Sequence, residues 1–149
     1  MDPEAIETRL RQFFATDREL IAKRLSQIET WVHDLQTLAR PEEIRRDVRE
    51  ERFVEHTLQI AIQATLEVAA RIVADELLGE ARTSRELFEL LERHGWIPAD
   101  LASGLRRMAG LRNVLVQGYG DVDLGIVEEI VRHHVGDLLR FVEVVRGKL

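Results

Sequence analysis

Apolar residues recur at three- and four-residue steps along most of the chain, the spacing that gathers them on one face of an α-helix. The first such stretch begins at Pro3 and runs to about Leu38, before Pro41 interrupts the pattern. A second long stretch follows Asp47, a suitable N-cap, and closes at Gly79. Its apolar stripe is the widest in the chain, which predicts the central and most buried helix.

Three further helices follow in the second half of the chain. A short helix over residues 85–93 is capped by Thr83 or Ser84, and a turn at 95–98 separates it from the next helix. That next helix carries the polar cluster considered below. Asp123 then caps a last helix that we expect to continue unbroken from Leu124 to about Lys148.

No segment shows the two-residue alternation of a β-strand. Four long helices and one short helix predict an all-α fold, an antiparallel four-helix bundle with an additional short helix. With 149 residues, the chain has room for one hydrophobic core, so we expect a single domain over residues 1–149.

Composition narrows the cellular setting and the chemistry. The chain is 45% hydrophobic and 32% charged, as in ordinary globular proteins, and it has no cysteine for disulfides or thiol catalysis. The acidic start, Met1 to Ala5, is unlike a signal peptide. No apolar run approaches the roughly 18 residues that span a bilayer. We therefore expect a cytoplasmic protein with no membrane contact.

The charge distribution excludes one broad class of nucleic-acid binder. A net charge of −6 argues against coating nucleic acid through bulk electrostatics, although a small basic cleft is compatible with it. A local basic excess occurs at Arg106, Arg107 and Arg112, and the first two are candidate RNA-binding residues. The arginines between Arg40 and Arg52 are balanced by acidic neighbours, which predicts a solvated helix face with ion pairs.

The polar cluster lies between Gly110 and Tyr119, in an otherwise aliphatic helix. At about 100° per residue, Arg112 and Tyr119 share one stripe of the helix, and Asn113 and Gln117 share the adjacent stripe. The apolar residues around them are expected to face the core; they are Met108, Leu111, Val114 and Leu115.

Two interpretations of this cluster follow from spacing alone. In the functional one, Arg112 holds a phosphate through paired hydrogen bonds and Asn113 orients the arginine or a ribose. In the structural one, the cluster is a polar groove of the bundle, where Arg112 pairs with a carboxylate and Tyr119 caps the packing. The spacing leaves both open.

The cluster and much of the chain resemble a known family. The stretch from 112 to 119 is similar to the signature of the HepT-like ribonuclease toxins, a branch of the HEPN superfamily: Arg, four residues, His, one residue, Tyr. The resemblance extends to the segments on either side, at 55–64, 88–97, 101–110 and 120–123.

The resemblance implies a fold, an activity and partners. HepT-like proteins are all-α homodimers whose motif helices meet in a composite cleft, and they act as metal-independent endoribonucleases on tRNA or mRNA, with no cofactor. By this resemblance Arg112 would stabilise the phosphate and Asn113 would position it. Tyr119 matches the tyrosine to which a minimal nucleotidyltransferase antitoxin, of the MntA type, adds AMP. The chain would then be the toxin of a type VII-like pair.

Gln117 is the departure from the family pattern, because it occupies the position of the catalytic histidine. An amide can hydrogen-bond to RNA but cannot exchange protons near neutral pH, so a loss of about 10²–10⁴-fold in rate is expected. Of the other histidines, His133 or His134 on the last helix could face the cleft. The sequence does not distinguish a natural Gln117 from a deliberate inactivating change.

Two other functions remain open at this stage. One is a catalytically inactive HEPN homodimer that binds a nucleotide or a nucleotidyltransferase. The other is a helical scaffold unconnected with RNA. A metal site is not expected, because the chain contains no His-Glu-x-x-His or Glu-x-x-His pair.

Overall fold

The computed structural model describes residues 2–117 and 122–149, with the side chains of residues 11–17 left aside. The described residues fold into helices joined by short connections, so the all-α prediction is confirmed. In chain order the elements are α1 (Pro3–Thr37), η1 (Pro41–Glu43), α2 (Val48–Asp75), α3 (Ser84–Arg93), α4 (Ala99–Gln117), α5 (Leu124–His133) and α6 (Gly136–Lys148).

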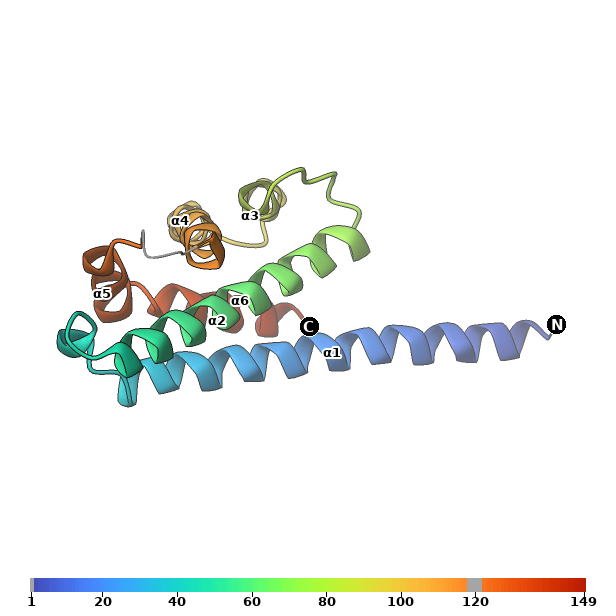
Figure 1. Cartoon of the computed structure of the whole chain (residues 1–149). Coiled ribbons are helices and arrows are strands. Elements are labelled where there is room, and N and C mark those ends of the chain that lie inside the picture. Colours follow the sequence, from blue (N-terminus) through green and yellow to red (C-terminus); the bar gives the residue numbers. More distant parts are fainter. Residues whose placement is uncertain (1, 118–121) are drawn as a thin grey trace.

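Helix α1 is partly inside and partly outside the folded body. Its C-terminal half packs against α2 and α6 through fully buried side chains such as Leu25, Ile28 and Val32. Figure 1 shows its N-terminal half extending alone beyond the other helices. Ile6 and Leu10 on that half are accordingly exposed.

A tight connection reverses the chain between α1 and α2. The short 3₁₀ helix η1, which the sequence pattern did not predict, begins at Pro41. The carboxylate of Glu50, on the first turn of α2, accepts a hydrogen bond of 2.5 Å from the backbone N–H of Arg40. Glu50 is nearly buried, so this bond satisfies a polar group that would otherwise be costly to bury.

Helix α2 is the central element, as its wide apolar stripe predicted. It runs antiparallel to α1 (Figure 1) and packs against α1, α3, α4 and α6. By length and composition α2 could cross a membrane, but 61% of its apolar window is buried by the rest of the fold. That burial accounts for its apolar character.

The end of α2 differs from the prediction that Gly79 closes it. The helix ends at Asp75, and positive φ occurs first at Leu77, with φ of 53°, and then at Gly79, with φ of 136°. The N–H of Leu78 reaches back to the carbonyl of Val73 at 3.0 Å, a bond typical of a helix end closed by a left-handed residue. Leu77 thus occupies a position that usually holds glycine.

Helices α3 and α4 pack against each other and lie over α2; both are seen nearly end-on in Figure 1. Thr83 caps α3 by accepting a 3.2 Å hydrogen bond from the N–H of Glu86, and Glu86 in turn accepts one from the N–H of Arg82. Phe88 of α3 meets Phe141 of α6 edge to face, with ring centroids 6.2 Å apart. These contacts close the core over α2.

Our prediction of a single last helix is wrong, because the chain forms two helices there, α5 and α6. His134 leaves helical geometry, with φ of −125°. The N–H groups of Asp137 and Leu138 then donate hydrogen bonds to the carbonyls three residues before them, at His134 and Val135. Gly136 has low helix propensity, which makes a break inexpensive here. The break lets α5 turn towards η1 while α6 packs along α1 and α4.

Candidate functional site

The second half of α4 carries the polar cluster and is only partly covered. Met108, Leu111 and Leu115 are buried, as predicted, and they attach this part of α4 to the core. Val114 was also expected in the core, but it is 46% exposed. The last turns of α4 extend past the core, so residue 114 borders a groove instead of a packed neighbour.

Arg112 lies half-buried at the edge of this exposed surface. Its Nη1 donates a 3.3 Å hydrogen bond to Oδ1 of Asn113. Its Nε is buried and has no hydrogen-bond partner among the residues that the structure describes. Within residues 2–117 and 122–149, no carboxylate forms an ion pair with Arg112.

Asn113 and Gln117 are both exposed and lie one helical turn apart on α4, of which Gln117 is the last residue. The helix therefore presents two amides and one incompletely paired guanidinium together at its C-terminal end. Tyr119, the expected modification site, lies outside the described residues.

The two candidate RNA-binding arginines have different surroundings. Arg106 faces α3, where its Nη1 lies 3.9 Å from the carboxylate of Glu92. Arg107 is exposed, and within the described residues its guanidinium donates hydrogen bonds to Ser103, at 3.4 and 3.5 Å. Arg107 therefore keeps its charge available, whereas Arg106 is already paired.

A groove of about 730 Å³ opens between α4 and α5, beside the polar cluster. Its apolar side chains come from both helices: Met108, Leu111 and Val114 from α4, and Ile126 and Ile130 from α5. Arg107 and Arg85 stand at its edge. This surface combines an apolar wall with two arginines and with three acidic side chains, Asp123, Glu129 and Asp137.

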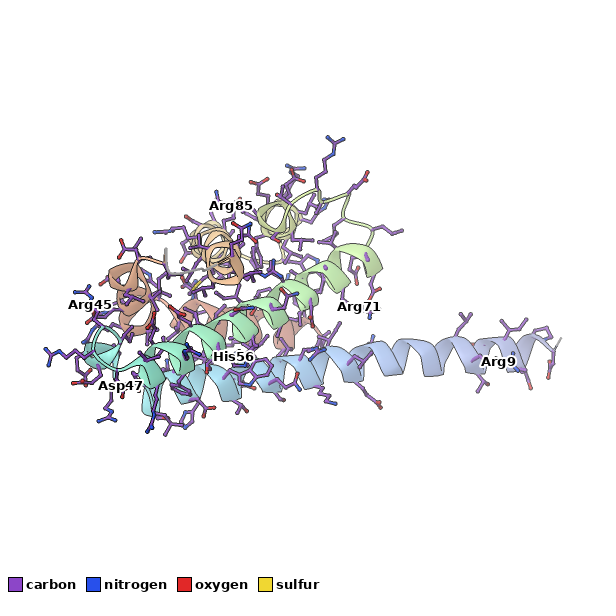
Figure 2. The ribbon with its side chains drawn as sticks, viewed as in Figure 1. Arg9, Arg45, Asp47, His56, Arg71 and Arg85 are labelled. Carbon is purple, nitrogen blue, oxygen red and sulfur yellow. The ribbon has the colours of Figure 1, made fainter. Side chains whose placement is uncertain are left out.

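Arg85 is a residue that the sequence reasoning missed. It belongs to α3 (Figure 2), yet its guanidinium lies against the backbone of α4 at Gly110, where a Cβ would collide with Nη2. Only a glycine at 110 permits this approach. Arg85 is far from the cluster in sequence, so spacing could not reveal the contact; the unusual glycine inside an apolar helix was the available signal.

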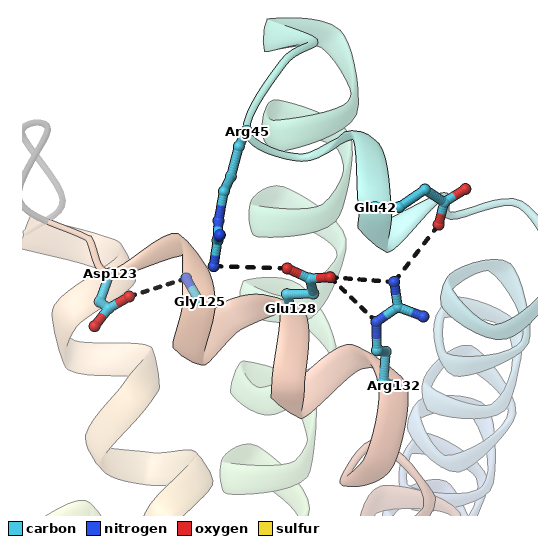
Figure 3. Close-up of polar contacts among 6 residues, drawn as sticks. All are labelled: Glu42, Arg45, Asp123, Gly125, Glu128 and Arg132. Atoms are coloured by element: carbon cyan, nitrogen blue, oxygen red, sulfur yellow. Dashed lines mark hydrogen bonds and ion pairs between the residues drawn. The ribbon is translucent and has the colours of Figure 1, made fainter.

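Helix α5 is anchored by a network of charges, shown in Figure 3. The carboxylate of Glu128 lies 3.7 Å from Arg45, in the turn before α2, and 3.1 Å from Arg132 of its own helix. Arg132 also reaches Glu42 of η1 at 3.8 Å. Of the arginines between Arg40 and Arg52, Arg45 thus forms an ion pair, across elements and not along one helix face.

The two histidines considered as substitutes for Gln117 lie where α5 ends. His133 is exposed at the end of α5, and His134 borders the groove with its Nε2 3.8 Å from Glu129. Neither is on α4. Among the described residues, no three His, Asp or Glu side chains gather as a metal site would require.

Comparison with known proteins identifies the family. The "Ribonuclease HepT-like" family matches residues 15–145. The chain belongs to this family. A HepT-like relative from Shewanella oneidensis, named mRNA nuclease HepT, is 34% identical over 91 residues, which cover 61% of this chain and 68% of the relative. The family is thus one of ribonucleases, and the resemblance seen in the sequence is confirmed.

Solved HepT-like structures share the fold. A toxin–antitoxin crystal structure with AMP-PNP matches with a TM-score of 0.82 and 27% identity, covering 87% of this chain and 98% of the other. The tri-AMPylated HEPN toxin of Shewanella oneidensis, in complex with its MNT antitoxin, matches with a TM-score of 0.80 and 28% identity, covering 86% and 97%. These neighbours are toxins bound to antitoxin partners.

Proposed function

We propose that this chain is the toxin of a type VII-like HepT/MntA toxin–antitoxin pair that acts in the cytoplasm. Its activity would be metal-independent endonucleolytic cleavage of tRNA or mRNA at the C-terminal end of α4. The observation that carries the proposal is Arg112: a guanidinium with a buried Nε that lacks a partner among the described residues, beside two exposed amides. An arginine held in this way is suited to an incoming anion.

In the proposed reaction the phosphoryl group of the RNA is transferred from the 5′-oxygen of one nucleotide to the 2′-oxygen of the nucleotide before it. The ribose 2′-oxygen loses its proton and attacks the adjacent phosphorus, and the 5′-oxygen leaves with a proton, giving a cyclic phosphate. Arg112 would stabilise the charge that builds up on the phosphorane oxygens, and Asn113 would orient Arg112 through their 3.3 Å hydrogen bond. Gln117 could hydrogen-bond to the 2′-oxygen or the phosphate but could not exchange the proton.

The active form would be a homodimer with a composite cleft. The C-terminal end of α4 supports this assembly, because Val116 is about half exposed there, next to the exposed Gln117. Apolar side chains exposed at the end of a helix are suited to cover by a second subunit. The two polar clusters would then face one RNA strand.

Neutralisation would occur by transfer of AMP to Tyr119. The phenol oxygen would attack the α-phosphorus of ATP, releasing pyrophosphate and leaving an anionic adenylate two residues beyond the end of α4. Added negative charge and bulk in an anion-binding cleft would oppose RNA binding. The AMPylated toxin among the structural neighbours supports this assignment.

The decisive experiment is a cleavage assay in EDTA with the parent chain, Gln117→His and Arg112→Ala. We expect weak cleavage by the parent, a gain of about 10²-fold or more with Gln117→His, and loss with Arg112→Ala. Cleavage that is unchanged by Arg112→Ala would place the site elsewhere. Incubation with a nucleotidyltransferase antitoxin and ATP, followed by mass spectrometry, should find AMP on Tyr119.

The exposed Gln117 also favours a second candidate function, an inactive HEPN homodimer that binds a nucleotide or a nucleotidyltransferase. With a glutamine at 117 and neither His133 nor His134 on α4, the proton-transfer group has no evident replacement. If Gln117→His gains no cleavage but the antitoxin still binds, this second function is the correct one.

A further inference from the structure

The groove between α4 and α5 contains cationic groups that the cleavage motif does not use. Arg85 rests on Gly110, and Arg107 projects from the turn of α4 before it. Within the described part of the chain, neither guanidinium has a carboxylate partner. In a chain of net charge −6, two arginines without carboxylate partners among the described residues are the groups of this groove that can meet a phosphate.

Three acidic side chains also line the groove, and each has a contact of its own. The contacts are Asp123 with the N–H of Gly125 at 2.9 Å, Glu129 with His134 at 3.8 Å, and Asp137 with Arg140 at 3.9 Å. These acidic side chains come from α5, its N-cap and α6, whereas Arg85 and Arg107 come from α3 and α4, so the cationic side of the groove is the α3–α4 side.

The position of Arg85 relates the groove to the polar cluster. Gly110 precedes Gln117 by seven residues, so the two lie on nearly the same face of α4, about 10 Å apart along the axis. Asn113 lies between them, one turn from Gly110. A strand that places a phosphate at the polar cluster can therefore pass over Gly110 and meet the guanidinium of Arg85.

We propose that the groove binds the part of a single-stranded RNA that adjoins the cleaved phosphate. Arg85 and Arg107 would each contact a backbone phosphate, and a base would lie on the apolar wall formed by Leu111 and Ile126. The assignment rests on the proposed ribonuclease function and adds substrate-binding residues outside its motif. It makes α3, through Arg85, part of the RNA-binding surface.

The test measures binding of a short single-stranded RNA whose 2′-hydroxyls are methylated, so that it cannot be cleaved. Arg85→Ala and Arg107→Ala should each weaken binding about tenfold at low salt. Each should also make the plot of log binding constant against log salt concentration less steep, by about 0.7 in slope, which is the amount for one phosphate contact on a single strand. Arg85→Lys should retain most of the slope.

Two variants make the test specific. Arg93→Ala removes an exposed arginine from the end of the same helix, outside the groove, and should leave affinity and slope unchanged. Gly110→Ala keeps both arginines but displaces the tip of the Arg85 side chain from its place on α4, so it should weaken binding less than Arg85→Ala does. Circular dichroism and light scattering verify fold and oligomeric state for each variant.

The outcomes separate the groove from the motif. If the parent binds RNA and Arg112→Ala weakens it, but Arg85→Ala and Arg107→Ala do not, the groove assignment is wrong and the proposed function stands. If the parent binds no RNA, both fall. If Arg85→Ala instead changes the oligomeric state, the groove is a protein–protein contact and the RNA assignment is overturned.

Discussion

Asp137 of α6 lies directly over the α-carbon of Gly104 in α4: a methyl group at 104 would collide with its carboxylate oxygen and come within 3.0 Å of its Cγ. Gly104→Ala should therefore destabilise the fold, by up to about 2 kcal/mol, because overpacking exceeds the gain in helix propensity. Urea unfolding measures the difference.

Gly147, in the last turn of α6, is the matched control, since a Cβ there meets nothing within 4 Å. Gly147→Ala should be neutral or stabilising by up to about 1 kcal/mol. Adding Asp137→Ala to Gly104→Ala should recover part of the loss. If both glycine variants have equal stability, the close approach of α6 to Gly104 does not exist in solution.

Leu77→Gly should stabilise the protein. Leu77 has φ of 53° and is 88% exposed, so its side chain contributes little burial while its backbone is strained. Glycine removes a left-handed penalty of roughly 1 kcal/mol. The measurement is the unfolding midpoint in urea. Leu38→Gly is the control: Leu38 is also exposed but has ordinary right-handed geometry, so that variant should lose stability.

Stability should depend on pH through Glu55. Burial, and then the neighbouring Glu51, raise the pKa of Glu55 above its ordinary value of 4.5. A raised pKa means that the protonated form is favoured in the folded state, so stability is full below pH 4.5 and falls as pH rises through the folded pKa. Glu55→Gln should therefore be more stable than the parent at neutral pH, with the difference vanishing in acid.

Glu29 provides the opposite case in the same pH series. Its hydrogen bond to Arg146, at 2.5 Å, lowers the pKa of Glu29 below 4.5. The stabilisation is present above pH 4.5 and is lost as pH falls through the lowered pKa. Glu29→Gln should weaken the fold slightly at neutral pH, because the pair is nearly half exposed. Equal pH profiles for both variants would contradict these assignments.

Arg112→Met should separate stability from activity. The buried Nε of Arg112 lacks a hydrogen bond within the described part of the chain, and an unsatisfied buried donor costs about 1 kcal/mol or more. Replacing it with an apolar side chain of similar length should leave the free energy of unfolding equal or higher, while RNA cleavage is lost. A marked loss of stability would instead assign Arg112 a structural role.

The sequence predicted most helices because each carries a local signal. The caps at Asp47, Thr83 and Asp123 each accept the expected backbone hydrogen bond, and the stripe of α2 marked the central helix. Where local signals compete, the prediction failed. The sequence has no strong helix-termination signal at residues 134–136. The break there follows from the different elements against which α5 and α6 pack.

The candidate site was only partly accessible to sequence reasoning. Spacing placed Asn113 and Gln117 on one face, but it could not distinguish the buried Leu111 from the exposed Val114, since that depends on where the core ends. Nor could it distinguish Arg106 from Arg107, because a partner from α3 decides which charge is paired. Arg85 required the fold, as it meets α4 across 25 positions of sequence.

Gln117 is the last residue of α4 and its side chain is in solvent, so core packing does not restrict which residue occupies position 117. Glutamine and histidine codons differ only in their third base. Under the proposed function, one nucleotide change could therefore raise or lower toxicity with almost no effect on folding, and a cell could carry a weak or a potent toxin on the same scaffold.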